Sequence, residues 1–290
     1  MNNTIIKILN KLDLLRWINI HGYLRLNNKE FTIPILGKTG HANLFMSEPW
    51  MTDLLKIILP IENKTFIDVG VNVGQSLLKL KSISAEINYI GFEPNPICIH
   101  YLTKLMKANQ FKNTAIIPVG ISEKNELGTL HFFYASGADS SASMVADFRP
   151  DQKVDRKEFI PLLNLDSLKE TIQMDSLSIL KIDVEGAELE VINSFKKEIN
   201  EKSPIILMEI LPVYNDKYPN RLERQNQIQT VLRDASYSIY RVKKKDDKLL
   251  GFQEIEAIGI HSDLNNCEYV MVPQLKKEKF NNQLQGWLNN

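Results

Sequence analysis

The 290-residue sequence lacks the features that mark several common classes of protein. It has only two cysteines, Cys98 and Cys267, without metal-binding spacing, so neither a disulfide framework nor a zinc site is indicated. Its 35 basic and 35 acidic residues give a formal net charge of zero, which argues against a broad surface for nucleic acid or anionic lipid. Asn, Lys and Asp interrupt residues 1–20 too often for a signal peptide or a membrane span. We therefore expect a cytoplasmic protein that binds no nucleic acid and has no membrane span.

What the sequence does contain is a regular alternation of short apolar runs and helical patterns. This alternation predicts a doubly wound α/β fold with a mostly parallel, seven-stranded Rossmann-like sheet and an antiparallel edge. The expected strands are 65–70, 87–93, 113–120, 177–183, 204–210, 237–242 and 268–273. The expected helices are 74–82, 95–110, 187–199 and 221–235.

Two parts of the chain lie outside this alternation. Residues 1–59 are expected to form an N-terminal helical and hairpin extension, with an amphipathic helix that packs on its own core and a turn at Asn27-Asn28. A further helix should begin there with Ser47 as its N-cap. Residues 60–290 would then be the main α/β domain, with a two-stranded β-hairpin insertion at about 121–163. The mixed charges of "KKKDDK" predict a solvated loop tip.

The most informative stretch is "KTFIDVGVNVGQS", where an apolar strand ends in a glycine-rich turn before a helix. In a doubly wound sheet, ligands bind beyond the carboxyl ends of the strands, and glycines let the backbone come close to them. The spacing is not the G-x-G-x-x-G of a nicotinamide site, because Asn72 stands between Gly70 and Gly74. Asp68 precedes the turn, and Glu93 ends the next strand, where a carboxylate can bind both hydroxyls of an adenosine ribose. Such acids suit a cationic ligand, S-adenosylmethionine, better than a pyrophosphate.

Three segments, "FIDVGVNVGQS", "IGFEPNP" and "LKIDVEGAELEVI", together resemble the FkbM family of S-adenosylmethionine-dependent methyltransferases. "DVEGAE" is the most family-specific part, whereas the glycine turn alone would indicate only the wider class I methyltransferase superfamily. The resemblance covers residues 60–215 and implies O-methylation of a hydroxyl, often on a sugar or a polyketide-derived acceptor. Val71 departs from the small residue that is frequent at its position. By the family pattern the cofactor would be held by Asp68, Gly70, Asn72, Gly74 and Glu93.

Further acids end the fourth and fifth expected strands. Asp183 ends the fourth strand beside the glycine turn, so we expect it to contact the cofactor near its methyl group. A carboxylate there can orient or deprotonate an acceptor hydroxyl, which makes Asp183 and Glu185 the candidate catalytic residues. Glu209, at the end of the fifth strand, could join Asp183 as a ligand of a divalent metal ion, although nothing in the sequence requires a metal. The alternative is that Asp183 and Glu185 only stabilise the N-terminus of the next helix.

Other polar residues are weaker candidates. Glu188 lies in the first turn of a helix and is expected to be structural, and His131 and His261 are isolated from other reactive groups. The loop "GADSSASM" is placed to form a lid or an acceptor wall, although a plain flexible loop explains it equally well. Its candidate polar contacts are Asp139, Ser140, Ser141 and Ser143.

Two other functions remain open beside the predicted S-adenosylmethionine-dependent O-methyltransferase with a small-molecule or glycan acceptor. A nicotinamide-dependent oxidoreductase on the same fold is disfavoured by the missing middle glycine. A non-catalytic, cofactor-binding partner protein is disfavoured by the acids at three strand ends, Asp68, Glu93 and Asp183. In a purely structural interpretation, Asp68 and Glu93 would only cap the helices that follow them.

Overall fold

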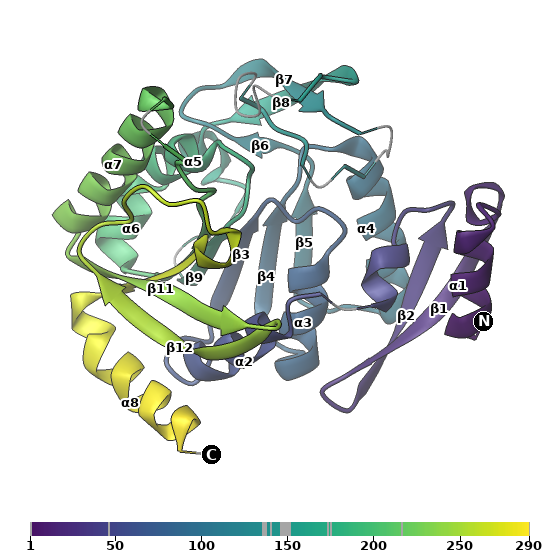
Figure 1. The fold of residues 1–290 in the computed structure, drawn as a ribbon, viewed down its shortest axis with the longest axis horizontal. Coiled ribbons are helices and arrows are strands. Elements are labelled where there is room, and N and C mark those ends of the chain that lie inside the picture. Colours follow the sequence, from purple (N-terminus) through teal and green to yellow (C-terminus); the bar gives the residue numbers. More distant parts are fainter. Residues whose placement is uncertain are drawn as a thin grey trace.

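The structure is a computed structural model that describes residues 2–45, 47–134, 138–139, 141–145, 152–172, 174, 176–215 and 217–289 (Figure 1). Its helices are α1 (Asn3–Lys11), α2 (Pro49–Ile58), α3 (Gln75–Ile83), α4 (Pro96–Asn109), α5 (Glu188–Ser194), α6 (Lys196–Lys202), α7 (Pro219–Asp234) and α8 (Lys277–Leu288). Its strands are β1 (Asn19–Leu26), β2 (Lys29–Leu36), β3 (Thr65–Val69), β4 (Asn88–Phe92), β5 (Thr114–Ile117), β6 (Gly120–Ile121), β7 (Glu126–Phe132), β8 (Arg156–Leu163), β9 (Leu177–Ile182), β10 (Ile205–Glu209), β11 (Tyr237–Lys245), β12 (Lys248–Ile255) and β13 (Glu268–Pro273).

The central sheet confirms the predicted doubly wound fold but has eight strands instead of seven, in the order β12-β11-β13-β10-β9-β3-β4-β5. Strands β10, β9, β3, β4 and β5 are parallel, and β13 runs antiparallel between β10 and β11. The extra strand, β12, pairs with β11 as a hairpin. The expected loop tip is therefore only the turn at Asp246 and Asp247, both with positive φ, while the lysines around it continue the two strands.

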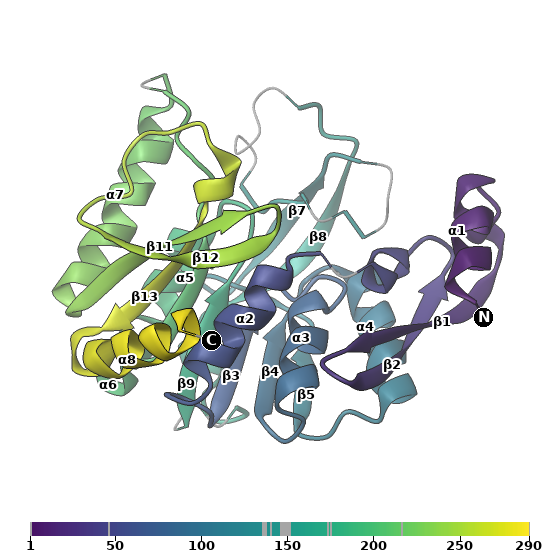
Figure 2. The ribbon, with the colours of Figure 1, turned by 60° about the horizontal axis from the view of Figure 1, so that its bottom comes forward.

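Helices cover both faces of the sheet (Figure 2). Helices α2, α3, α4 and α8 share one buried cluster with strand residues such as Phe66, and α5, α6 and α7 share a second cluster with residues such as Ile67. Adjacent β3 residues thus point to opposite faces, as the pleat of a strand requires. Because both faces are buried, every side chain of β3 is buried, including that of Asp68.

The N-terminal hairpin is confirmed, with β1 and β2 joined at Asn27-Asn28, both in the left-handed region that a two-residue hairpin turn needs. The hairpin rests on α4, where the Asn109 side chain exchanges two 2.8 Å hydrogen bonds with the backbone of Thr32. The predicted amphipathic helix is α1. Its packing on the core is only partial, since Ile6 is its one fully buried side chain while its neighbour Ile5 is 50% exposed.

The insertion is a three-stranded sheet, β6-β8-β7, where the sequence predicted two strands. Its third strand arises because the expected strand at 113–120 is interrupted. β5 ends at Ile117, before Pro118, and β6 leaves the central sheet to pair in parallel with β8. Proline has no backbone N–H to donate to a ladder, so a break at this position is expected.

Three other predictions differ from the structure. Ser47 is not an N-cap: Glu48 precedes α2, and the Ser47 hydroxyl donates a 2.9 Å hydrogen bond to the Gln75 side chain. The expected helix at 187–199 is divided at Phe195 into α5 and α6. Helix α8 was not predicted at all. Among the described residues, no helix combines the length and apolarity that crossing a membrane requires.

Candidate functional site

A cavity of about 580 Å³ lies beyond the carboxyl ends of β3, β4, β9 and β10, where a doubly wound sheet binds its ligands. The volume falls within the roughly 300–1,000 Å³ range of small-molecule sites. Six of the predicted cofactor-binding, catalytic and metal-binding residues line this cavity together: Gly70, Asn72, Glu93, Asp183, Glu185 and Glu209.

The glycine turn brings two loops into direct contact. Gly70 has φ of +92°, and a Cβ at this position would lie 1.8 Å from the Asp183 carbonyl oxygen. No other residue type fits there, so this glycine allows the β3 and β9 turns to meet. Gly74, also a predicted cofactor contact, does not line the cavity, and a Cβ there would lie 2.9 Å from the Leu102 side chain of α4.

Glu93 follows β4, and backbone N–H groups hold its carboxylate in place. Its carboxylate accepts backbone hydrogen bonds from Asn72 at 2.6 Å and Asn95 at 2.8 Å. Burial raises the pKa of Glu93 to about 7, against the opposing effect of these two N–H groups. Each carboxylate oxygen retains a second lone pair for a further donor. The side chain is therefore fixed by the backbone and lines the cavity.

Asp68 does not line the cavity, contrary to the expected direct contact with the cofactor. Its side chain is fully buried and accepts hydrogen bonds from the Tyr89 hydroxyl at 2.7 Å and from Lys181 Nζ at 3.1 Å. Lys181 Nζ also donates to Asp183 at 3.1 Å. Asp68 is thus connected to the cavity through its hydrogen bond with Lys181. The sequence analysis did not single out Lys181, although it precedes Asp183 by two residues.

Lys181 is a buried cation between two carboxylates. Burial alone would lower the pKa of Lys181, but Asp183 and Asp68 raise it above its ordinary value, so the ammonium form persists. Burial raises the pKa of Asp68, and Lys181 opposes that rise. Side chains two residues apart on a strand point to the same side, so Lys181 and Asp183 lie side by side. This spacing is the signal in the sequence that could have identified Lys181.

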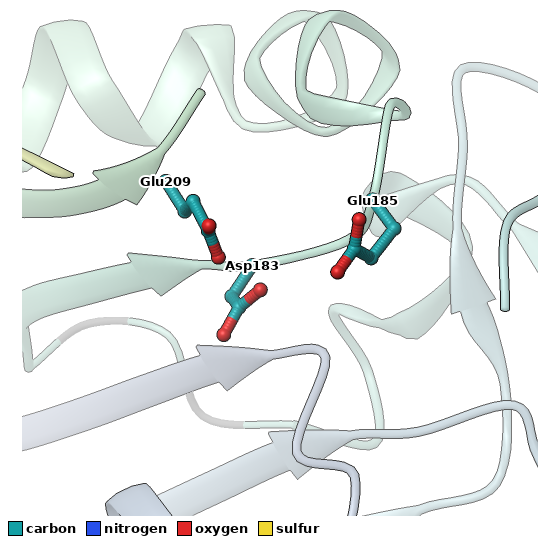
Figure 3. Close-up of side chains that lie close together, drawn as sticks. All are labelled: Asp183, Glu185 and Glu209. Carbon is teal, nitrogen blue, oxygen red and sulfur yellow. The ribbon is translucent and has the colours of Figure 1, made fainter. Parts of the chain in front are cut away.

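Three carboxylates lie close together at the carboxyl ends of β9 and β10 (Figure 3). One oxygen each of Asp183, Glu185 and Glu209 lies within 4.8 Å of the others, so the group could hold a metal ion through the oxygen ligands that hard cations prefer. Burial, followed by the charges of Asp183 and Glu185, raises the pKa of Glu209 to about 10. Glu209 is therefore a neutral acid near pH 7 in the absence of a cation.

The insertion supplies another wall of the cavity through Asp139, Ala142 and Met144. Asp139 accepts hydrogen bonds from the backbone of Phe133 and Tyr134 and from Ser141, so it organises its own loop. The Ser143 hydroxyl donates a 2.6 Å hydrogen bond to the Glu185 carbonyl oxygen, which ties the insertion to the β9 turn. Ser140 lies outside the described residues.

The remaining candidates have structural partners. Glu188 accepts the Gly186 N–H at 2.7 Å, as expected for a helix start. His131 lies beside the Ser143 carbonyl oxygen and His261 beside the Tyr269 hydroxyl, and neither lines the cavity.

The N-terminal region contributes a wall for which the sequence offered no motif, formed by residues 38–40, 42, 47 and 48. Asn43 fastens this wall, because its side-chain amide donates to the Val73 carbonyl at 2.7 Å and to the Tyr101 hydroxyl at 3.0 Å. Residues of the hairpin region therefore face the same space as the glycine turn.

The fold and the cavity define an α/β protein of the Rossmann-like class with a ligand site at its strand ends. Residues 68–251 match the protein family described as "Methyltransferase FkbM domain". The chain belongs to this family of S-adenosylmethionine-dependent methyltransferases. The curated methyltransferase sdnD of Sordaria araneosa is 24% identical over 205 residues, which cover 62% of this chain and 75% of that protein.

Two solved structures are also similar. An FkbM methyltransferase from Methylobacillus flagellatus is 18% identical with a TM-score of 0.43, covering 72% of this chain and 43% of that one. This chain thus spans less than half of that protein's length. A putative caffeoyl-CoA O-methyltransferase from Staphylococcus aureus is 14% identical with a TM-score of 0.42, covering 77% of this chain and 82% of that one.

Proposed function

We propose that this methyltransferase transfers a methyl group to a hydroxyl oxygen of a sugar, a glycan or a secondary metabolite. The observation that carries the proposal is that Glu93 and Asp183 line the same cavity. Glu93 is held there by the backbone N–H of Asn72, and Asp183 by the ammonium group of Lys181. We assign residues 60–290 to the catalytic domain, and the N-terminal extension and the insertion to the walls of its cavity.

The residues of the β3 and β4 ends would hold S-adenosylmethionine, which supplies a methyl group already activated by its sulfonium. Glu93 has lone pairs for two ribose hydroxyls, because its backbone partners use only one on each oxygen. Gly70 and Asn72 bring backbone close to the ligand. Six carboxyl groups line the cavity, from Glu48, Glu93, Asp139, Asp183, Glu185 and Glu209, against the ammonium groups of Lys38 and Lys181. Glu209 is neutral near pH 7 and Glu93 only partly ionised. The other four carboxyl groups still outnumber the two ammonium groups, and this excess of acidic groups suits a cationic cofactor.

Asp183 is the residue that we assign to the acceptor. Its side chain is 38% exposed, lines the cavity and is oriented by Lys181. An ionised carboxylate in this position can accept the proton of the acceptor hydroxyl as the new bond forms. Glu209, neutral near pH 7, hydrogen-bonds to Asp183 and helps to fix its orientation.

The variant Asp183→Asn tests this role, with Asp53→Asn as a control at a partly exposed acid of α2. Loss of a general base should lower turnover by about 10²–10⁴-fold. S-adenosylhomocysteine affinity should stay within a few-fold of the parent. Normal turnover in a folded Asp183→Asn protein would end the catalytic assignment. If Asp183 instead holds a metal ion, EDTA should abolish the activity of the parent protein and magnesium or manganese should restore it.

A further inference from the structure

Helix α1 exposes a row of apolar side chains on its outer side. The side chains of Ile5, Ile8 and Leu12 are 50%, 52% and 61% exposed. Residues three and seven positions apart lie on the same side of a helix, so these three form one stripe, which we call the α1 stripe. The buried Ile6 lies on the side of the helix that packs on the core. Three large aliphatic side chains are thus left to water where a helix ordinarily buries them.

Packing against β1 fixes the direction in which the α1 stripe points. The Asn3 side chain donates to the Tyr23 carbonyl oxygen at 2.7 Å and accepts the Tyr23 N–H at 3.3 Å. Gly22 gives Ile6 its place, because a Cβ at this position would lie 2.9 Å from the Ile6 side chain. Both views show α1 at the outer edge of the molecule (Figures 1 and 2). The stripe is therefore exposed while the helix that carries it is held in place.

An exposed tryptophan follows α1 in the chain. Trp17, in the short 3-10 helix Leu15–Trp17, is 74% exposed, and the Arg16 guanidinium carbon lies 5.0 Å from its ring centre. Tryptophan is enriched where proteins meet the interface between lipid and water, because its ring is apolar and its N–H is polar.

The surroundings of the α1 stripe are basic, although the chain as a whole is neutral. Residues 2–45 contain six lysines and arginines but only two acids. Lys7, Lys11 and Arg16 are exposed, and the one acid among residues 2–17, Asp13, is paired with both Arg16 and Lys38. A net charge of zero argues against a broad basic surface, but this local excess of positive charge is compatible with it.

We propose that the α1 stripe docks this protein reversibly on the surface of an anionic phospholipid bilayer. The aliphatic side chains and Trp17 would enter the boundary between headgroups and acyl chains, and the basic side chains would bind the headgroups. A second copy of the chain fits this surface less well. In a symmetric dimer each patch meets itself, so Lys7 and Lys11 would face the same lysines of the other copy. The proposal goes beyond the proposed function and does not depend on it.

The test is sedimentation of the full chain with vesicles of phosphatidylcholine, with and without 30 mol% phosphatidylglycerol. The parent should bind the anionic vesicles at least tenfold more tightly, and less tightly as salt rises. Ile8→Glu should weaken this binding at least tenfold, and the Lys7→Gln, Lys11→Gln double variant about tenfold. Leu275→Glu is the matched control, because Leu275 is 71% exposed just before α8, which lies on the opposite side of the molecule (Figure 1). Anionic vesicles should also shift the parent's tryptophan emission to shorter wavelengths, a shift that Trp17→Phe should remove.

Three results would overturn the proposal, each in variants that keep the parent's melting temperature. The first is equal or absent binding to the two kinds of vesicle. The second is binding that Ile8→Glu weakens no more than Leu275→Glu does. The third is a dimer, measured by light scattering, that Ile8→Glu dissociates while vesicles bind neither protein, which would assign the α1 stripe to a second copy of the chain.

Discussion

Replacing Lys181 by methionine removes the buried cation that Asp68 and Asp183 share. Asp183 is 38% exposed and can be solvated. Asp68 is fully buried and, among the described residues, would keep only the Tyr89 hydroxyl as a side-chain partner. Breaking a buried ion pair and leaving one charge behind costs about 3–5 kcal/mol. We therefore expect Lys181→Met to lower the free energy of unfolding by about that amount near pH 8, as measured by urea denaturation.

The loss should depend on pH. In the variant, the folded-state pKa of Asp68 lies above its unfolded value, because burial raises the pKa and the opposing lysine is gone. A group with a raised folded-state pKa contributes stability at low pH that is lost as pH rises through that value. The difference between parent and variant should thus be smaller at pH 5 than at pH 8. Adding Asp68→Asn should recover most of the loss, since no buried charge then remains.

Lys79 is a matched control, because its side chain is also fully buried and pairs with a carboxylate. Its partner Glu48 is 42% exposed, so Lys79→Met leaves behind a carboxylate that water can solvate. We expect a loss below about 1 kcal/mol with little dependence on pH. Equal losses for the two variants, or a Lys181→Met loss that is the same at pH 5 and pH 8, would refute this reasoning.

Two further predictions concern the other acids of the cavity. Because the pKa of Glu93 is raised to about 7, its carboxylate becomes ionised between pH 6 and pH 8, and S-adenosylhomocysteine binding should tighten roughly tenfold over that range. Calorimetry on Glu93→Gln should show a flat profile, and parallel profiles in the two proteins would contradict the ribose role. Because the pKa of Glu209 is raised to about 10, Glu209→Gln mimics the neutral acid and should leave the melting temperature at pH 7 unchanged. A fall in the melting temperature of the parent on adding EDTA, absent in Glu209→Gln, would show instead that Glu209 is ionised and holds a cation.

Most of the central sheet could be predicted because its strands are buried on both faces and appear as short apolar runs. Strand β12 could not, since it is an edge strand whose charged residues resemble a loop. The split of the expected helix at Phe195 and the exposure of α1 depend on packing with distant segments, which local periodicity does not describe.

The candidate site was predictable to the extent that strand ends determine it. Glu93, Asp183, Glu185 and Glu209 end neighbouring strands or follow them directly, and the structure brings them to one cavity. The different placement of Asp68 follows from the pleat, because its side chain points into the protein toward Tyr89 and Lys181. A second cavity, lined by Lys217, Arg221 and Arg224 among others, depends on how the start of α7 lies beside the β9 turn, and no motif in the sequence encodes that arrangement.

The most direct test of the central claim is calorimetric titration of the parent protein and Glu93→Ala with S-adenosylhomocysteine and with NAD. The account predicts that S-adenosylhomocysteine binds the parent protein, that Glu93→Ala weakens this binding at least tenfold through the loss of two charged hydrogen bonds, and that NAD gives no heat. Binding of NAD with no response to S-adenosylhomocysteine, or an S-adenosylhomocysteine affinity that Glu93→Ala leaves unchanged, would contradict the assignment of this cavity.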